Sequence, residues 1–454
     1  MLKVSRPANG EYFGLYLMGK KVGYFYTHVE AMESHPARAR AVNEFVFKAS
    51  VGSKISERRH KEVRVYEAKV GGRLLSFTVE QQGDGGDQTL EATATPTGLT
   101  VLRKRPHQPD EVLKLPPSPE TIEDADQVRV AVFRSKNVQG RITDGMDLET
   151  YGLSTTLGEP ETRTLGGVKV KLSKAVTVSE KEKVPVEAFL DDKGRMVEIQ
   201  FGATMRAVAE SEPVAKRLDQ VEVFGLTRVV LPKKLPPSMR TVPGQLTFVM
   251  TGLPEKFRKD SSRQTFRARH NDQVEVTVRA SPPSKQPAAL PLADPSGGGY
   301  LKSSIIVESS NEEIRALAQK LVGDETDAYA AAKRIVSWVY RNLEKDYGSS
   351  ADRATDVLRQ KKGDCTEHSL LSVALMRAAG IPAKRVDGVV YMLNDDGVPA
   401  LYWHEWVGAY VGEWTELDPT FGQDVADATH FAVGEEGNAE ITPLIGQLKV
   451  LDVH

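Results

Sequence analysis

The sequence contains one cysteine, little net charge and no long apolar run. A single Cys among 454 residues excludes an intrachain disulfide and a zinc site built from several cysteines. Lys and Arg number 60 against 62 for Asp and Glu, which gives no electrostatic reason to expect nucleic acid or an anionic membrane as a partner. No apolar segment reaches the length that spans a bilayer, so the sequence predicts no membrane span.

The sequence also lacks the apolar core of a signal peptide near Met1. A cytoplasmic location follows if the chain begins there, and a periplasmic or extracytoplasmic one follows if a signal was removed before Met1. The single cysteine does not decide between them, because a secreted protein can also carry one catalytic thiol. Compartment and oligomeric state therefore stay open at the level of sequence.

Changes in composition divide the chain into four expected segments. A length of 454 residues predicts two to four domains. Pro and Gly crowd the stretch from Ser281 to Gly299, which is typical of an extended linker or a loop laid over a surface. We therefore expect a β-rich N-terminal domain at 1–238, a small β segment or second β domain at 239–280, a linker at 281–300 and a further domain at 301–454.

The N-terminal region shows the two-residue period of β-strands. Residues 62–66 alternate in this way, and the segments 184–190 and 196–201 flank the turn signal Asp191-Asp192-Lys193-Gly194. One helical stretch is expected near Ala207 to Leu218. Such alternation leaves one sheet face packed and one solvated, which predicts a large, mainly antiparallel β region.

The last third of the chain changes to helical periodicity and then returns to strands. The expected helices begin at Ser310 or Asn311, at Asp324 or Thr326, near Ala354 and at the turn before Cys365. Strands follow at 385–393, 401–411 and 413–417. Helices followed by antiparallel strands predict an α+β fold class.

The only cysteine lies at the expected start of a helix. Lys361-Lys362-Gly363 is a turn signal, and Asp364 is suited to cap the helix that follows. Cys365 then falls in the first turn, where backbone N–H groups and the helix dipole favour a thiolate and can also stabilise an oxyanion. This position argues against a cysteine that merely fills a core.

A histidine and an aspartate follow on two expected strands. If Gly412 is the centre of the turn between them, His404 lies opposite position 420 and Asp418 falls on a neighbouring rung. A thiol nucleophile needs a base, and the base needs an acceptor that fixes its tautomer. Cys365, His404 and Asp418 supply these three parts.

Three short motifs then resemble those of one known family. Gly363-Asp364-Cys365-Thr366-Glu367-His368, His404-Glu405-Trp406 and Leu417-Asp418-Pro419-Thr420 resemble, in order, the motif blocks of the transglutaminase-like superfamily, a papain-like cysteine fold. The resemblance covers roughly residues 305 to 445 and is to the multidomain bacterial type. It implies that 301–454 is a catalytic domain in which Cys365 attacks an amide carbonyl to form a thioester. His404 acts as base, Asp418 orients it, and no cofactor takes part.

Other residues near these motifs have more than one interpretation. Tyr347 is a guess for the second oxyanion donor, and the sequence does not decide it. His368, one turn after Cys365, could be the base or half of a metal pair, but Cys-x-x-His offers too few ligands for zinc, so we expect no metal. We expect His368 instead to pack beside the site or to help place the substrate. Trp403 and Trp406 either wall a cleft or belong to the core. Asp427 and His430 are expected to form a loop pair held by local hydrogen bonds.

Two classes of function remain. The first is an acyl-transfer enzyme acting on a protein or peptide substrate, either a transglutaminase or a protease or amidase. The second is a binding or scaffold protein with a retired domain of the same fold. Retired members usually lose a triad residue, and all three are present here, which favours the enzyme.

Overall fold

The computed structural model describes residues 9–51, 54–83, 87–106, 108–165, 167–181, 185–218, 221–284, 286, 288–346, 351–394, 396–435 and 444–454. The chain divides into two compact units, residues 1–222 and 223–454. Each unit has its own sheets, and each is described by itself.

The N-terminal unit is built on one antiparallel sheet of 15 strands. The strands follow the order β8-β7-β6-β5-β4-β3-β2-β1-β15-β14-β13-β12-β10-β9, and β11 pairs with β12. Their bounds are β1 (Glu11–Leu17), β2 (Lys20–Ala31), β3 (Arg38–Val51), β4 (Lys54–Glu67), β5 (Leu74–Gln82), β6 (Gln88–Thr95), β7 (Gly98–Lys104), β8 (Glu111–Leu115), β9 (Asn137–Thr143), β10 (Thr150–Leu157), β11 (Glu161–Leu165), β12 (Val168–Ser179), β13 (Val186–Leu190), β14 (Met196–Phe201) and β15 (Met205–Glu210). Most neighbours in this order are also neighbours in sequence, as in a meander of hairpins.

Local turn chemistry sets the register of these hairpins. Between β13 and β14 the Asp191 carboxylate accepts hydrogen bonds from the backbone N–H groups of Lys193 (3.0 Å) and Arg195 (2.9 Å). Gly194 adopts a φ of 80°, which a residue with a side chain rarely does. The expected turn is therefore confirmed at this position.

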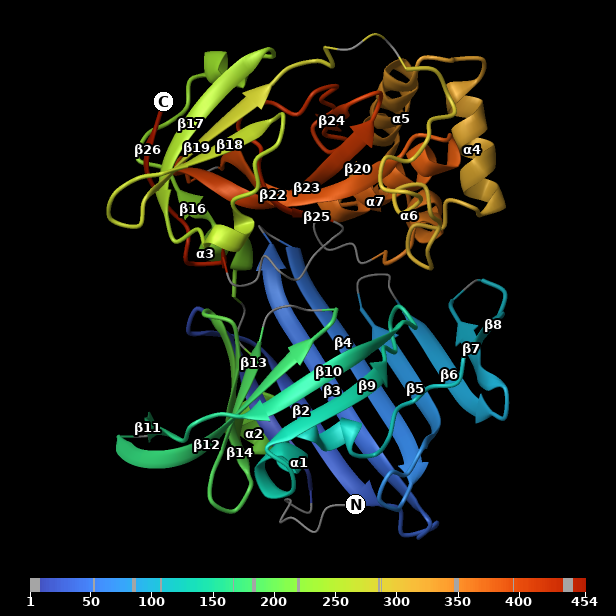
Figure 1. Cartoon of the computed structure of the whole chain (residues 1–454), viewed down its shortest axis with the longest axis vertical. Helices are drawn as coiled ribbons and strands as arrows, with labels where there is room; N and C mark the ends of the chain where they lie inside the picture. Colours follow the sequence, from blue (N-terminus) through green and yellow to red (C-terminus); the bar gives the residue numbers. More distant parts are fainter. Residues whose placement is uncertain are drawn as a thin grey trace. The chain divides into compact units, whose positions relative to one another are not determined.

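The sheet curves around a short helix (Figure 1). This helix, α1 (Gln127–Phe133), follows the 3₁₀ turn η1 (Asp124–Asp126) and packs against β9, β10 and β12. Residues of β1, β2, α1, β10, β12 and β14 line a cavity of about 200 Å³ beside it. A buried ion pair between Arg129 and Glu11 joins the helix to β1 at 2.5 Å.

The helix expected near Ala207 to Leu218 is formed only in part. Residues 205–210 form β15, which pairs with β1 on one side and β14 on the other, and only α2 (Glu212–Ala215) is helical. Ala, Met and Glu have high intrinsic helix propensity, but the backbone pairing with β1 and β14 on both sides outweighs this propensity.

The C-terminal unit combines three sheets with a group of helices. Its sheets have the orders β16-β23-β22-β25 with β24 beside β23, β18-β19-β17-β26, and β20-β21. The strands are β16 (Val229–Val230), β17 (Gly244–Thr251), β18 (Gln264–Ala268), β19 (Val274–Ala280), β20 (Glu344–Lys345), β21 (Lys362–Gly363), β22 (Ala383–Leu393), β23 (Pro399–Tyr410), β24 (Trp414–Leu417), β25 (Phe431–Glu435) and β26 (Lys449–Val453). The helical segments are α3 (Val223–Thr227), η2 (Pro237–Arg240), η3 (Glu255–Phe257), α4 (Glu312–Val322), α5 (Ala328–Asn342), α6 (Ala354–Gln360) and α7 (Cys365–Ala378).

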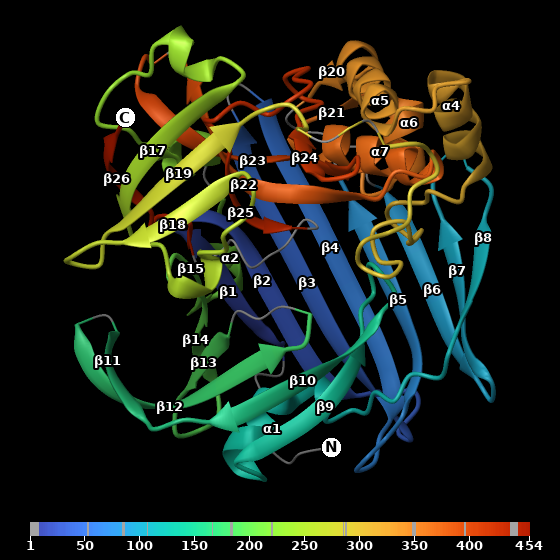
Figure 2. The same cartoon turned by 45° about the horizontal axis from the view of Figure 1, so that its top comes forward.

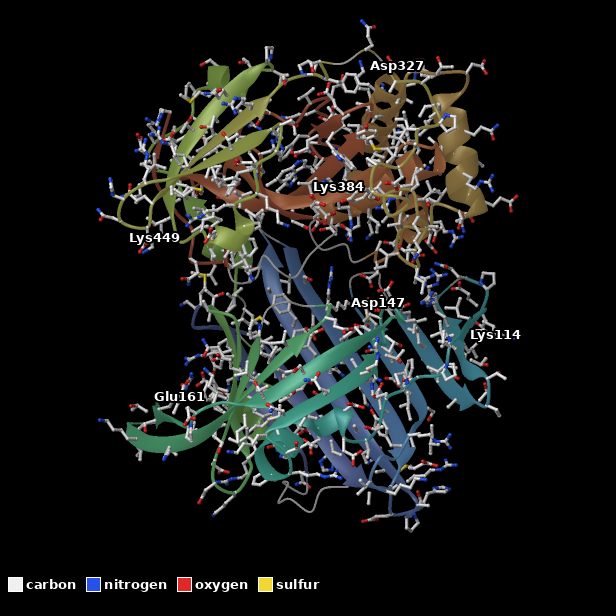
Figure 3. The ribbon with its side chains drawn as sticks, in the orientation of Figure 1. Lys114, Asp147, Glu161, Asp327, Lys384 and Lys449 are labelled. Atoms are coloured by element: carbon white, nitrogen blue, oxygen red, sulfur yellow. The ribbon has the colours of Figure 1, made fainter. Side chains whose placement is uncertain are left out.

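Side-chain caps fix where the first two long helices begin. Asn311 caps α4 by accepting from the backbone N–H of Glu313 at 2.9 Å. Asp327 caps α5 by accepting from Tyr329 (2.8 Å) and Ala330 (3.3 Å), and Figure 3 labels it at the start of this helix. The cap of α5 is therefore neither Asp324 nor Thr326, because the carboxylate of Asp327 reaches the free N–H groups instead.

Helices and the four-stranded sheet lie on opposite sides of β22 and β23 (Figure 2). One core joins α4, α5, α6 and α7 to residues such as Val407 and Leu417. A second core joins β17 and β19, through Phe248 and Val276, to Val389, Leu401 and Phe431. The five-stranded sheet is thus covered from two directions, and both cores depend on it.

The boundaries between domains differ from the expected ones. The chain divides after Glu222 rather than after residue 238, and 239–280 is part of the C-terminal unit. β17 pairs with β26 near the end of the described chain, so this β segment closes the C-terminal unit. Part of the linker expected at 281–300 is also packed, since Leu290 N–H donates to the carbonyl of Thr326 (2.9 Å) and Leu292 N–H to that of Gly380 (3.0 Å).

The fold is mixed and dominated by strands. About 46% of the chain is strand and 18% is helix, so the α+β class expected for the C-terminal part is compatible with the structure. Among the residues that the structure describes, no helix has the length and apolar content needed to cross a membrane.

A fragment containing only residues 301–454 should fail to fold, whereas a fragment of 223–454 should fold. The shorter fragment loses Phe248 and Val276 and leaves their apolar partners exposed to water. Circular dichroism and size-exclusion chromatography of the two fragments would check this. A monodisperse, cooperatively melting 301–454 fragment would contradict the assignment of β17 to β19 to this unit.

Candidate active site

Cys365 is the first residue of α7, and the chain before it is tightly fixed. Lys361 ends α6 in a left-handed conformation with a φ of 51°, and β21 then pairs in parallel with β20. Asp364 caps α7 by accepting from the backbone N–H of Thr366 at 2.7 Å. The Glu367 carboxylate accepts from the backbone N–H of Asp364 at 2.8 Å, which completes a capping box.

Close packing at this turn explains the glycine before the cap. A Cβ atom at Gly363 would lie 2.3 Å from the Cβ of Glu367. Any larger residue would therefore push Glu367 out of the capping box and disturb the first turn of α7.

His404 and Asp418 lie on neighbouring segments, as expected. Val407 pairs with Leu417 and Tyr410 with Trp414, a register that places His404 opposite position 420. β24 ends at Leu417, and Asp418 turns so that its Oδ2 lies 2.8 Å from Nε2 of His404. The predicted proximity of these two residues is confirmed.

The thiol lies beside the main chain that follows His404. The backbone of Glu405 hydrogen-bonds to Cys365, and Ser369 Oγ donates to the carbonyl of Glu405 at 3.1 Å. α7 packs directly on β23. The helix with the cysteine and the strand with the histidine therefore pack against each other, and Cys365 lies beside the residue that follows His404.

The surroundings of Cys365 oppose a thiolate. Burial raises the pKa of the thiol, and the negative charge of Asp364 and the neighbouring Glu405 carboxyl raise it further. Burial also raises the pKa of Glu367 to about 9. The shift in the pKa of the Cys365 thiol is opposite in direction to the thiolate expected at the helix start, because burial and, after it, the negative charge of the Asp364 cap act against a thiolate.

Asp418 is buried and accepts four hydrogen bonds. Its Oδ1 accepts from the backbone N–H groups of Thr420 (2.6 Å) and Phe421 (3.0 Å), and its Oδ2 accepts from His404 (2.8 Å) and His430 (2.9 Å). Burial alone would raise the pKa of this carboxyl, but the two histidines outweigh it and hold the pKa below its ordinary value. Asp418 is therefore a carboxylate, and each Nε2 donates to it.

Sequence reasoning missed the contact between His430 and Asp418. The local pair was expected, and Nδ1 of His430 does lie 3.3 Å from Oδ1 of Asp427. His430 is also fully buried and reaches Asp418, twelve residues earlier. Nothing in the spacing of polar residues marks such a contact, because the loop from 418 to 430 has no repeating pattern.

Part of the C-terminal unit matches one known family. The model of the transglutaminase-like superfamily matches residues 315–419, which span α4 to the turn at Asp418. This part of the chain belongs to that superfamily.

Two curated relatives, both described only as uncharacterised proteins, share parts of the chain. One from Haemophilus influenzae is 32% identical over 95 residues, which cover 20% of this chain and 26% of the relative. One from Mycobacterium leprae is 24% identical over 192 residues, covering 38% of this chain and 68% of the relative. The chain thus spans about a quarter of the first relative's length.

One solved structure with some similarity is the periplasmic domain of TgpA from Pseudomonas aeruginosa. It is 17% identical, with a TM-score of 0.28, and the match covers 43% of this chain and 87% of that domain.

The other predicted residues of the transglutaminase-like domain have different positions. His368 is buried, and its Nδ1 donates to the carbonyl of Asp364 at 2.7 Å. Burial lowers the pKa of its imidazole, and its Nε2 has no hydrogen-bond partner among the described residues. Trp403 is half-buried, packs against the second core and donates to the carbonyl of Thr227 at 3.0 Å. Tyr347 lies outside the described residues.

Aromatic rings fix the plane of His404. Trp406 is fully buried, and its ring lies nearly parallel to that of His404 at a centroid distance of 6.0 Å. Phe421 stacks on His404 at 4.9 Å. The indole N–H of Trp406 donates to Glu416 at 2.7 Å. Trp406 is therefore a core residue that also orients the histidine of the site.

His404, Asp418 and His430 also place three potential ligand atoms within 4.8 Å of one another. Tetrahedral zinc ligands about 2 Å from the metal lie roughly 3.3 Å apart. The distances of 2.8 and 2.9 Å between the two Nε2 atoms and Oδ2 fit hydrogen bonds better. The geometry therefore favours a hydrogen-bonded cluster at these three residues.

Iodoacetamide should alkylate Cys365 slowly at pH 6, and the rate should rise into the alkaline range. A raised thiol pKa leaves little thiolate at acid and neutral pH. Intact-mass spectrometry gives the rate directly, because the chain has one cysteine. Labelling that is already rapid at pH 6 and no faster at higher pH would contradict a raised thiol pKa.

The variant Asp364→Asn should speed this labelling at pH 7. Asn also caps helices well but carries no charge, so the thiol pKa should fall by about half a unit to one unit and the rate rise roughly three- to tenfold. Asp327→Asn makes the same exchange at the cap of α5 and should leave the rate unchanged. Equal rates for wild type and Asp364→Asn would show that the cap charge does not act on the thiol.

Proposed function

We propose that the C-terminal unit is a cysteine-dependent acyl-transfer enzyme that acts on a peptide or glutamine-type amide through a thioester. The hydrogen bond of 2.8 Å between His404 and Asp418 carries this proposal, together with the contact of Glu405, the next residue, with Cys365. Membership of residues 315–419 in the transglutaminase-like superfamily supports the same class of chemistry.

The hydrogen bonds assign a direction to the proton transfers. His404 donates from Nε2 to Asp418, which leaves Nδ1 with a lone pair for the thiol proton. As Nδ1 takes this proton, the sulfur of Cys365 bonds to the carbonyl carbon of the substrate. The imidazolium then gives this proton to the amide nitrogen, the carbon–nitrogen bond breaks, and the amine leaves while the thioester remains. Because burial and the nearby carboxyl groups raise the pKa of the thiol, we assign its deprotonation and the attack to one step.

The start of α7 offers one donor for the oxyanion. Asp364 already occupies the N–H of Thr366 and that of Glu367 in the capping box. The N–H of Cys365 is the first-turn donor left for the substrate oxygen. Tyr347 stays our proposal for the second donor.

The resolving nucleophile separates the two kinds of enzyme. Water gives a protease or amidase, and a primary amine gives a transglutaminase, with the same three residues in each. A glutamine peptide assayed with and without a primary amine distinguishes them, since only the transferase forms the cross-linked product.

One observation favours a second candidate, a binding or scaffold protein with a retired domain. Asp364 and the carboxyl groups of Glu367 and Glu405 gather around a thiol whose pKa is raised. Against this, the chain keeps Cys365, His404 and Asp418 and bonds the last two to each other, so the enzyme remains the preferred proposal.

Cys365→Ser should abolish turnover without changing the fold, because a serine hydroxyl is far harder to deprotonate than a thiol. His404→Ala should also lose turnover, whereas His368→Ala should keep a measurable rate, since His368 is committed to the carbonyl of Asp364. Release of ammonia or amine from a glutamine peptide measures all three variants. Full activity in Cys365→Ser, or loss only in His368→Ala, would contradict the assigned roles.

Asp418→Asn should lower the turnover rate by roughly two to four orders of magnitude while substrate binding changes little. An amide in place of the carboxylate no longer favours the tautomer with the proton on Nε2 of His404. Asp424→Asn removes an exposed carboxylate from the same loop and serves as control. An unchanged rate in Asp418→Asn would mean that the site works as a Cys–His pair.

A further inference from the structure

His430 is a fully buried histidine held between two carboxylates. Its Nε2 lies 2.9 Å from Oδ2 of Asp418, and its Nδ1 lies 3.2 Å from the carbonyl oxygen and 3.3 Å from Oδ1 of Asp427. No step of the chemistry above uses it. It shares with His404 the one oxygen atom that orients the base.

A count of protons fixes the state of this ring. A carboxylate oxygen and a backbone carbonyl oxygen only accept hydrogen bonds, so each ring nitrogen that contacts them must donate. His430 meets such acceptors at both nitrogens and is therefore an imidazolium. Burial lowers the pKa of this imidazole, but the hydrogen bonds that the ring donates to Asp418 and Asp427, together with their negative charges, outweigh burial and raise the pKa overall.

Further contacts hold this arrangement in place. Asp427 accepts from Arg240 Nε (3.0 Å), from Gln423 Nε2 (3.0 Å) and from the backbone N–H of Thr429 (2.9 Å). Arg263, itself buried, donates to the carbonyl of Ala426 at 2.6 Å and pairs with Glu416 at 2.8 Å. The loop from 418 to 430 is thus braced by two arginines, and Asp418 is kept from turning away from His404.

We propose that His430 is a positioning residue of the acyl-transfer site: it holds the Asp418 carboxylate against His404 and takes up part of its negative charge. The catalytic role of His430 rests on the proposed function, whereas its effect on the Asp418 carboxylate and on His404 can be measured without any substrate. The charged and titratable groups around His430 are Asp418, Asp427, Arg240, Arg263, Glu416 and His404.

The sharing of Asp418 has a definite sign. A carboxylate that faced His404 alone would stabilise its imidazolium fully and make it a stronger base. A cationic His430 on the same oxygen weakens that effect. His404 then remains a base that can take the thiol proton and an acid that can return it to the leaving amine.

The first test uses the wild-type protein. Nuclear magnetic resonance of protein labelled with ¹⁵N-histidine should show both ring nitrogens of His430 protonated at pH 7, and the spectrum of His430→Gln identifies its signals among those of the nine histidines. A neutral His430 at pH 7 would overturn the inference. So would a shift of the His404 and His430 signals on adding one equivalent of Zn²⁺, because it would mean that the cluster binds metal.

The second test compares His430→Gln with Asp424→Asn. Gln can still donate to Asp418 but carries no charge, so the ¹⁵N titration of His404 should move to higher pH. The pH at which His404 titrates, read from its ¹⁵N shifts, should be unchanged in Asp424→Asn. A lower melting temperature in His430→Gln with an unchanged His404 titration would overturn the inference, because it would show a merely structural role.

These readouts separate the inference from the proposed function. A shifted His404 titration supports the coupling whether or not Cys365 turns over a substrate. Conversely, turnover by the wild type that is lost in Cys365→Ser supports the enzyme, whatever the His404 titration shows. An unmoved His404 titration in His430→Gln overturns only the role of His430.

Discussion

One buried carboxylate determines the arrangement of the whole site. Moving a carboxylate out of water costs several kcal/mol, so Asp418 is stable only because four donors surround it. Two of these donors are backbone N–H groups of its own turn, and Asp418 and Gln423 also exchange backbone hydrogen bonds of 2.9 Å. The loop after β24 therefore folds around this charge. Its backbone N–H groups bind Oδ1, and the two histidines bind Oδ2.

A similar balance operates at the start of α7, but with the opposite effect. The helix dipole contributes about half a positive charge, whereas the cap that stabilises the helix contributes a full negative one. Asp364 thus builds the turn that presents Cys365 and at the same time disfavours its thiolate. A thiol with a raised pKa needs a nearby base to remove its proton. The contact between Cys365 and Glu405, the residue after His404, brings the histidine's strand next to the thiol.

The parts of the structure that depend on neighbouring residues were predictable from the sequence. Helix α6 begins at Ala354, as expected, and the hairpin centred on Gly412 brings Asp418 to His404. The sequence did not reveal β15 as a strand, the place of β17 in the C-terminal unit or the contact of His430 with Asp418. Each of these depends on a partner far along the chain, which local propensity and periodicity do not encode.

The two histidines on Asp418 show how identical side chains acquire different chemistry. Both donate from Nε2 to the same oxygen, and the difference lies in what the second nitrogen meets. Nδ1 of His430 faces the oxygens of Asp427, which hold a proton there, and the ring has no access to solvent. Nδ1 of His404 has no carboxylate partner among the described residues, and the strand that carries it touches the helix of Cys365. The second nitrogen, more than the shared carboxylate, therefore separates the ring that can exchange a proton from the ring that keeps one.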